Sequence, residues 1–312
     1  MVTIKSTKTI LMVILIIVVA VISLLVIGAL FLFNNIDTGN AIKKGNVALI
    51  KINGPIMVED GVSFIASDAI ASTKIIEYIE KAKNDPSVRG IIFEINSPGG
   101  SAVASEEIGE AIKELRDETN KITVAWIREV GASGGYWVAS ATEHIVANKM
   151  SITGSIGVIA SYLEFSGLLE KYDVKYQRMV SGEHKDMGSP LKEMTEEEEA
   201  LFQEQLDLIH NYFIEEVAKN RNLNKEQIQK VSDGSIILGA KAKELGLVDE
   251  LGSKKEALEY IEKKLSIEAE LIEYKEAPSF LELFSKIMNE HGFSIGRGIG
   301  SVFSVDNDKI IT

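Results

Sequence analysis

Short apolar stretches alternate with amphipathic stretches along the middle of the chain, and this alternation limits the fold more than any other feature of the sequence. Three stretches rich in Ile and Val predict buried strands, at 47–52, 90–95 and 122–127. Apolar residues at helical spacing predict the helices that follow, at 73–84, at 104–115 and from Gly134 onward. Strands and helices in alternation are typical of an α/β fold with a largely parallel sheet.

The remaining elements follow from similar patterns. Further short strands are predicted at 144–147, 157–160 and 174–180. A capping-box pattern, Thr195-Glu-Glu-Glu198, predicts the start of a long helix. Residues 236–250 predict a small helical element, and 254–265 predict a further helix.

Composition excludes several classes of function. The formal net charge is −13, and an acid excess of this size argues against nucleic acid as a partner. The chain has no cysteine, which excludes thiol nucleophiles, disulfides and cysteine-ligated metals. Its 312 residues suffice for one large domain or two small ones.

Residues 10–33 form an apolar run that only Ser23 and Gly28 interrupt. As a helix this run would be about 36 Å long, enough to cross a hydrocarbon core of about 30 Å. It exceeds the apolar region of a cleaved signal peptide and lacks a clear Ala-x-Ala site, so we expect a signal anchor. Lys5 and Lys8 precede it, which predicts a cytoplasmic N-terminus and a body outside the cytoplasm. The expected segments are 1–9 (cytoplasmic), 10–33 (transmembrane), 34–45 (linker), 46–276 (main domain) and 277–312 (a tail with an amphipathic stretch).

Ser133 stands among glycines in Gly131-Ala-Ser-Gly-Gly135, after a predicted strand and before a predicted helix. Such backbone can turn sharply and lets a substrate approach closely, so this serine is a candidate nucleophile. A Ser–His–Asp/Glu triad is one way to activate it. The four histidines are more simply interpreted as surface or packing residues; they are His144, His184, His210 and His291. His184 is the hardest to set aside, because it neighbours a candidate lysine.

That lysine is Lys185, in Ser181-Gly-Glu-His-Lys185. A lysine that loses its proton in a dry pocket can accept the proton of a serine hydroxyl. The polar stretch around Lys185 is by itself typical of a solvated loop, so both interpretations stay open. Backbone N–H groups at a helix start could hold a developing oxyanion, and Gly99-Gly100 lies at such a place. A tight turn is the plainer interpretation of these two glycines.

Taken together, four motifs in order resemble the signal peptide peptidase A family, whose members are membrane-anchored serine proteases with the Clp protease/crotonase fold. The motifs are Asn96-Ser-Pro-Gly-Gly100, Ala132-Ser-Gly-Gly-Tyr136, Thr153-Gly-Ser-Ile-Gly-Val158 and Ser181-Gly-Glu-His-Lys-Asp186. Residues 239–252 match the family further downstream, so the resemblance covers 47–265. It implies an α/β fold of repeated ββα units with one N-terminal transmembrane helix.

The resemblance also implies roles for single residues. Ser133 would be the nucleophile, Lys185 the general base, and Ser155 the hydroxyl that orients the lysine amine. Gly100, with the N–H of Gly134 or Ser133, would form the oxyanion hole. No cofactor and no metal are implied. The substrates would be residual signal peptides and other membrane-associated or unfolded peptides, degraded outside the cytoplasm by the 46–276 domain.

Members of this family form ring- or dome-shaped oligomers, and in the short form the serine and the lysine come from neighbouring protomers. This chain has the length of the short form, so the resemblance implies a homo-oligomer of about eight subunits. Each subunit would contact the lipid bilayer through residues 10–33.

Three other functions stay open. A related membrane-bound protease would cleave the hydrophobic tail of a stomatin-like partner. A crotonase relative would process acyl-CoA, although the membrane run and the serine–lysine motifs both argue against it. A non-enzymatic scaffold would keep the fold without needing Ser133 and Lys185.

Overall fold

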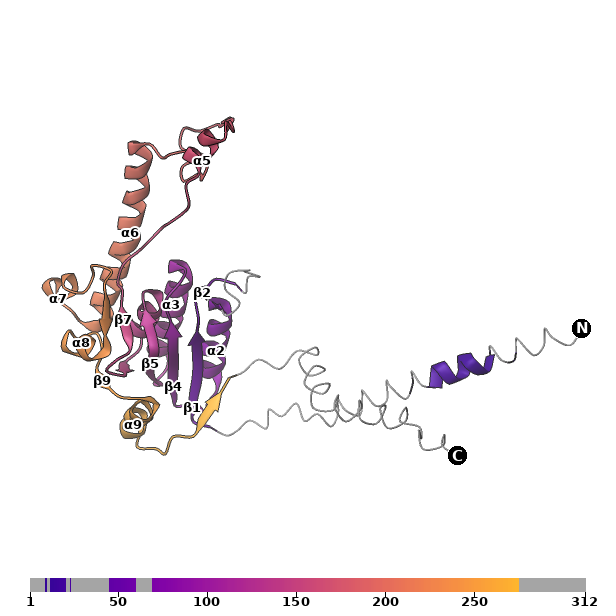
Figure 1. Ribbon diagram of the computed structural model, residues 1–312. Coiled ribbons are helices and arrows are strands. Elements are labelled where there is room, and N and C mark those ends of the chain that lie inside the picture. The colour runs from indigo at the N-terminus through magenta and orange to yellow at the C-terminus, as the bar shows by residue number, and fades with distance from the viewer. Residues whose placement is uncertain (1–8, 10–11, 21–22, 24–44, 60–68, 275–312) are drawn as a thin grey trace, which may run out of the picture. The chain divides into compact units, whose positions relative to one another are not determined.

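The computed structural model describes residues 9, 12–20, 23, 45–59 and 69–274 (Figure 1). Its strands are β1 (Val47–Asn53), β2 (Ile56–Met57), β3 (Ile70–Ala71), β4 (Gly90–Ser97), β5 (Ile122–Ala132), β6 (His144–Ala147), β7 (Ile152–Gly154), β8 (Ile236–Leu238), β9 (Glu250–Leu251) and β10 (Leu271–Glu273). The helices are α2 (Ser72–Asn84), α3 (Ala102–Glu118), α4 (Gly134–Ser140), α5 (Ser166–Lys171), α6 (Glu196–Arg221), α7 (Lys225–Gln229), α8 (Gly239–Glu244) and α9 (Lys254–Leu265).

One sheet organises these elements. Within the described residues it has eight strands, ordered β10-β1-β4-β5-β6-β9, with β7 and β8 extending it beside β5. Every neighbouring pair is parallel except β7 and β8. The α/β fold with a largely parallel sheet is therefore confirmed.

Helices cover both faces of the sheet (Figure 1). One face is covered by α2, which packs on β1, and by α3 and α4, which pack on β5; α4 also packs on β4, where Ile91, Phe93 and Ile95 are fully buried. On the other face Ile92 packs with Ala257 and Ile261 of α9. Burial on both faces explains why β4 is an almost continuous apolar run.

The strand β5 changes its partner halfway along. Residues 124–127 pair with β6, whereas residues 130–132 pair with β7. The register with β4 shifts between Ile95 and Ser97, and the side-chain Oδ1 of Asn96 accepts a hydrogen bond from Val130 N–H at 3.2 Å. This irregularity carries the chain from the sheet into the turn at Ser133.

Three predictions for the second half of the chain were wrong. Residues 157–160 and 174–180 form no strand, and Ile159, Val174 and Val180 are exposed. Their β-branched residues suit a strand, but no strand within the described residues forms a ladder with them. Residues 236–250 were expected to be helical and instead run through β8, α8 and β9.

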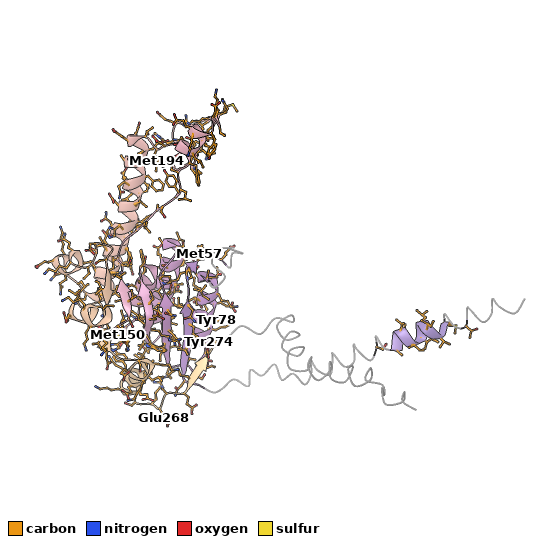
Figure 2. The ribbon with its side chains drawn as sticks, in the orientation of Figure 1. Met57, Tyr78, Met150, Met194, Glu268 and Tyr274 are labelled. Atoms are coloured by element: carbon orange, nitrogen blue, oxygen red, sulfur yellow. The ribbon has the colours of Figure 1, made fainter. Side chains whose placement is uncertain are left out.

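The long helix α6 starts where the sequence predicts, because the Thr195 side chain and the Glu198 side chain form a complete capping box. Its C-terminal half packs on the body, where Phe213 stacks on Trp137 of α4 with ring centroids 4.7 Å apart. Its N-terminal half accompanies α5 away from the sheet (Figure 1). Met194 marks this end in Figure 2. We call residues 157–212 the arm.

The predicted membrane segment falls mostly outside the described residues. Residues 12–20 are helical. No helix within the described part of the chain has the length and hydropathy needed for a membrane span. The tail 277–312 also lies outside the described residues.

Candidate active site

Ser133 occupies the single residue between β5 and α4, in a backbone conformation that serine rarely adopts. Its φ is 53° and its ψ is −126°. Surrounding hydrogen bonds hold it there: its N–H donates to Gly154 O at 2.9 Å, and its carbonyl accepts from Tyr136 N–H at 2.8 Å. The side chain is half-buried. The fold thus holds this serine in a sharp turn between the end of a strand and the start of a helix, the local arrangement in which the nucleophilic serines of α/β hydrolases lie.

The turn at Gly99 lies against the Ser133 turn. A Cβ added to Gly99 would lie 2.8 Å from Ser133 Cβ and 2.7 Å from Gly134 N, and φ of Gly99 is +99°. Only glycine fits a site this tight at that φ. The Ser97 hydroxyl accepts the Gly99 N–H at 3.1 Å and so fixes the turn.

The two turns bring together the proposed oxyanion donors. A Cβ built on Gly134 would lie 3.4 Å from Gly100 N, so the backbones of the two residues are adjacent. Gly134 N–H begins α4, where a helix provides no acceptor of its own. Ser133 N–H, the alternative donor, is already bonded to Gly154 O. Gly100 and Gly134 are therefore the pair that the geometry favours.

Ser155 lies beside Ser133, because each follows the end of one of two paired strands. Ala132 of β5 pairs with Gly154 of β7, and the serines come next. Ser155 also has a positive φ, 51°, and its N–H donates to Ser235 O at 2.8 Å. Both serines are half-buried and stand at the same edge of the sheet.

Lys185 is not part of this group within one subunit. It is exposed, in a turn of the arm. No hydrogen bond or ion pair within the described residues joins its ammonium to Ser133 or Ser155. The structure thus brings together Ser133, Ser155, Gly100 and Gly134 and leaves Lys185 apart from them.

The turn around Lys185 is held by ionic contacts that the sequence analysis did not single out. The Arg178 guanidinium donates to both carboxylate oxygens of Asp186, at 2.7 and 2.9 Å, and to Glu183 O at 2.7 Å. Lys192 bonds both carboxylate oxygens of Glu198 at 2.7 Å. The clue in the sequence was the unusual density of opposite charges over 178–198.

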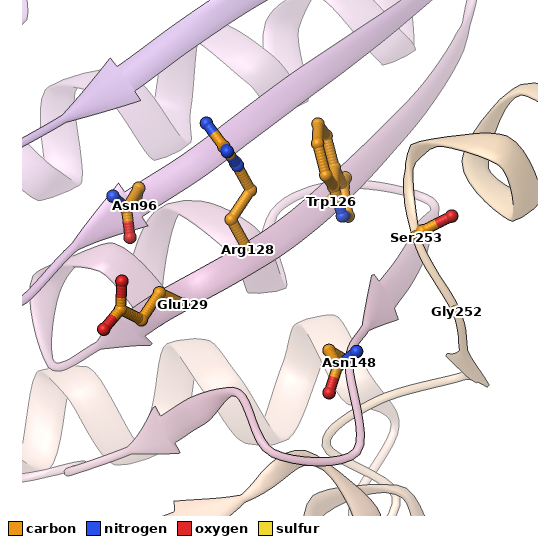
Figure 3. A pocket seen from close by; sticks show the side chains of 7 residues that line it. All are labelled: Asn96, Trp126, Arg128, Glu129, Asn148, Gly252 and Ser253. Carbon is orange, nitrogen blue, oxygen red and sulfur yellow. The ribbon is translucent and has the colours of Figure 1, made fainter.

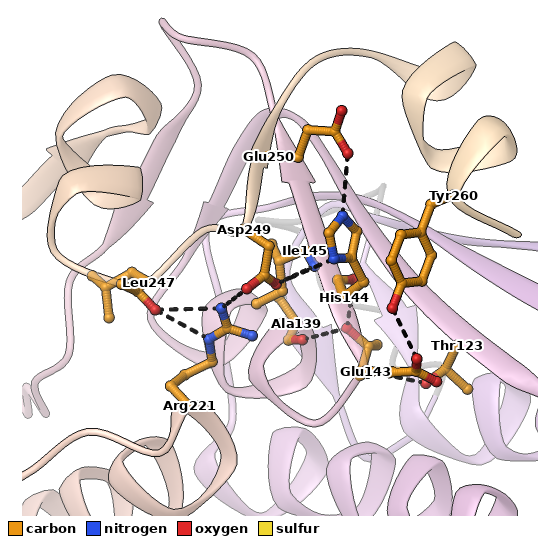
Figure 4. A network of polar contacts seen from close by, with 12 residues as sticks. Thr123, Ala139, Glu143, His144, Ile145, Arg221, Leu247, Asp249, Glu250 and Tyr260 are labelled. Carbon is orange, nitrogen blue, oxygen red and sulfur yellow. Dashed lines mark hydrogen bonds and ion pairs between the residues drawn. The ribbon is translucent and has the colours of Figure 1, made fainter. Parts of the chain in front are cut away.

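None of the described histidines is placed as a base for Ser133. His210 Nε2 lies 3.1 Å from Ile156 O, and His184 Nε2 lies 3.9 Å from a carboxylate oxygen of Glu197. His144 stacks on Tyr260 with ring centroids 3.8 Å apart (Figure 4). His291 lies outside the described residues. No histidine triad with Ser133 forms among the described residues.

The network around His144 has a structural role. Asp249 accepts from Arg221 at 2.6 Å and from Ile145 N–H at 2.8 Å, which ties the end of α6 to β6 (Figure 4). Nearby, the Tyr136 hydroxyl donates to Leu247 O at 2.8 Å. Complete burial raises the pKa of Tyr136, so this hydroxyl stays protonated and anchors α4 directly after the Ser133 turn.

A cavity of about 340 Å³ opens on the α9 face of the sheet (Figure 3). It is lined by Asn96, Trp126, Arg128, Glu129, Asn148, Gly252 and Ser253. Beside it, Arg128 pairs at 2.8 Å with Glu94, which is buried. None of these residues is Ser133, Ser155 or Lys185. The cavity is therefore separate from the serine site.

Comparison with known proteins agrees with this fold. The profile of peptidase family S49 matches residues 115–268. A putative protease of Methanocaldococcus jannaschii is 35% identical over 230 residues, which are 73% of this chain and 72% of that protein. A putative signal peptide peptidase SppA of Enterococcus faecium is 34% identical over 255 residues, 80% of this chain and 74% of that protein. Protease 4 of Haemophilus influenzae is 33% identical, and the match covers 68% of this chain and 34% of that protein.

These observations define a serine peptidase, with an α/β sheet that presents a strained serine at a strand end. The chain belongs to peptidase family S49.

Proposed function

We propose that this protein is a membrane-anchored endopeptidase with a Ser133–Lys185 dyad, which degrades residual signal peptides and other membrane-associated or unfolded peptides. The observation that carries the proposal is the contact between the Ser133 turn and the Gly99–Gly100 turn. This contact sets Ser133 beside the backbones of Gly100 and Gly134, which supports a nucleophile with two oxyanion donors. The name of the Enterococcus faecium relative supports signal peptides as the substrate class.

In the proposed mechanism the Lys185 amine takes the proton of the Ser133 hydroxyl as the oxygen attacks a peptide carbonyl. The N–H groups of Gly100 and Gly134 stabilise the oxyanion of the tetrahedral intermediate. The intermediate collapses, the C–N bond breaks, and the leaving amine takes the proton back from Lys185. Water then attacks the acyl-enzyme with Lys185 again as base, which frees Ser133.

The base would come from a neighbouring subunit. Lys185 stands on the arm, away from its own Ser133, and the Ser155 hydroxyl would receive and orient the amine of the neighbour's lysine. The arm carries many exposed apolar side chains, among them Ile159, Leu163, Leu168, Tyr172, Val174 and Met179. Apolar surface of this extent supports burial against another copy. In a closed ring or dome of about eight subunits, every arm would be buried against a neighbouring subunit.

The sequence supports the remaining parts of the proposal. The apolar run 10–33 would anchor the chain, with the N-terminus in the cytoplasm and the 46–276 protease domain outside. The strand–helix order and the four motifs support a Clp protease/crotonase-like arrangement.

The dyad is tested with the variants Ser133→Ala and Lys185→Ala in the full-length protein. We expect each variant to lose peptide hydrolysis by at least about 1,000-fold, because the two groups act as one unit. The matched control is Lys175→Ala, which removes another exposed lysine of the arm and should leave activity unchanged. Activity that persists in Lys185→Ala contradicts the dyad and points to His184.

A serine-reactive fluorophosphonate probe tests the nucleophile separately. The labelled protein is digested, and the modified peptide is identified by mass spectrometry. We expect the label on Ser133 alone. A label on any other serine overturns the assignment.

A further inference from the structure

We propose that Arg178 and Asp186 form a clamp that shapes the turn carrying Lys185, and that both are positioning residues for peptide hydrolysis. This inference rests on the proposed function of Lys185 as the base. It concerns how the arm presents that lysine before any partner is bound.

The clamp closes the turn from both sides. Arg178 Nε lies 2.7 Å from one oxygen of Asp186, and Nη2 lies 2.9 Å from the other. The same Nη2 donates to Glu183 O at 2.7 Å. One guanidinium therefore holds a residue directly before the His184-Lys185 pair and the residue directly after it. A planar fork sets these donors in a fixed bidentate geometry, whereas an ammonium is a point charge on a flexible stem.

Backbone hydrogen bonds hold the turn internally, from Lys185 N–H to Gly182 O at 3.2 Å and from Met187 N–H to His184 O at 3.1 Å, but they do not fix its two ends, which are glycines. Gly182 and Gly188 flank it, with φ of +101° and +76°. Nothing lies within 4 Å of a Cβ added to Gly188, and at Gly182 the nearest atom is Lys185 Cβ at 3.9 Å. Glycines in open space leave the chain free to adopt many conformations. The clamp restricts a segment that would otherwise sample many positions for Lys185.

A second ion pair joins the clamp to the start of α6. Lys192 binds Glu198 at 2.7 Å and lies 3.7 Å from Asp186. Glu198 is also the carboxylate of the α6 capping box, where it accepts from Thr195 N–H at 3.0 Å. These contacts fix the position of the Lys185 turn relative to the start of α6.

The clamp contributes to position more than to stability. The Arg178 side chain is 42% exposed, and exposed ion pairs contribute little to folding. The Arg178 guanidinium lowers the pKa of Asp186, so its carboxylate stays ionised and paired at neutral pH. Misplacing a catalytic group by about 1 Å can cost about 100-fold in rate. Loss of the clamp should therefore reduce catalysis without unfolding the protein.

The test compares Arg178→Gln and Arg178→Lys with the wild-type oligomer, using Lys175→Gln as the matched loss of one arm charge. We expect kcat to fall about 10- to 100-fold in Arg178→Gln, with KM, oligomer size and the Ser133 labelling site unchanged. The melting temperature should shift by less than about 4 °C. Arg178→Lys should recover only a small part of the loss, because it restores the charge but not the fork.

Each outcome decides the matter. A wild-type kcat in Arg178→Gln or Arg178→Lys overturns the clamp. A fall in kcat that comes with a melting temperature lowered by more than about 4 °C, or with a dissociated oligomer, indicates a structural role and also overturns it. Lys185→Ala, assayed in parallel, separates this result from the dyad: if that variant remains active, the proposed base is wrong whatever Arg178 does.

Discussion

At the scale of single residues, the fold stores strain at its two central serines. Ser133 and Ser155 have φ of 53° and 51°, a region that L-residues other than Asn and Asp seldom occupy. Such conformations cost about 1–3 kcal/mol and persist only where the surroundings impose them. Here hydrogen bonds to Gly154 O and Ser235 O impose them. Glycine would adopt the same φ without this cost, so the strain suggests a role for the two serine hydroxyl groups.

The strain can be measured by comparing Ser133→Gly with Ser133→Ala. Both variants lose the hydroxyl and should be inactive, but only glycine relieves the backbone. We expect Ser133→Gly to be more stable than Ser133→Ala by about 1 kcal/mol, measured as the free energy of unfolding in urea. Equal stability of the two variants would show that the turn is unstrained.

The Ser133 turn could be predicted from the sequence, because glycines on both sides of a serine after a strand leave few other conformations. The position of Lys185 could not. It depends on the path of residues 157–194, which show no helical period and whose apolar side chains resemble those of core strands. For the same reason the strands expected at 157–160 and 174–180 were wrong. The clamp escaped notice because charge density alone does not say which residues pair.

At the scale of elements, the change of strand partner along β5 positions the site, and a lysine cap at the end of α2 supports the body. The strand β7 was missed because three residues, Ile152–Gly154, are too few to show a pattern. Its place is fixed by the change of partner along β5.

At the opposite ends of the strands, Lys121 binds the C-terminal carbonyls of α2: its ammonium lies 2.5, 2.8 and 2.7 Å from the carbonyl oxygens of Ala82, Lys83 and Asp85.

Replacement of this lysine by Lys121→Met should destabilise the body. Three carbonyls at the end of α2 lose a charged donor, and methionine fills a similar volume without replacing it. We expect a loss of about 1–3 kcal/mol in the free energy of unfolding, followed by tryptophan fluorescence in urea. Lys255→Met, on the exposed surface of α9, is the control and should change stability by less than about 0.5 kcal/mol. Equal effects of the two substitutions contradict the cap.

At the scale of the whole molecule, the separation of Ser133 from Lys185 within one subunit allows a test of the proposed assembly. If each site combines a serine with a neighbour's lysine, two inactive variants can restore one another. A Ser133→Ala subunit still provides Lys185, and a Lys185→Ala subunit still provides Ser133.

Mixing the two variants in equal amounts during assembly should therefore recover about a quarter of wild-type activity, because half the sites have an intact serine and half of these have an intact neighbouring lysine. The measurement is the specific peptidase activity of the mixed oligomer, with each variant assembled alone as control. An inactive mixture would show that serine and lysine act within one subunit.

The edge of the sheet where β1 meets β10 has a consequence for biogenesis. Val47 pairs with Leu271, whereas it pairs with Gly90 on its other side. During synthesis β1, β4 and β5 can associate once the chain reaches Ala132, but β10 is made last. Closing so long a loop is entropically costly and slow. Almost the entire body must therefore be synthesised before β10 can pair with β1. Until then the outer edge of β1 is unpaired and open to association with other chains.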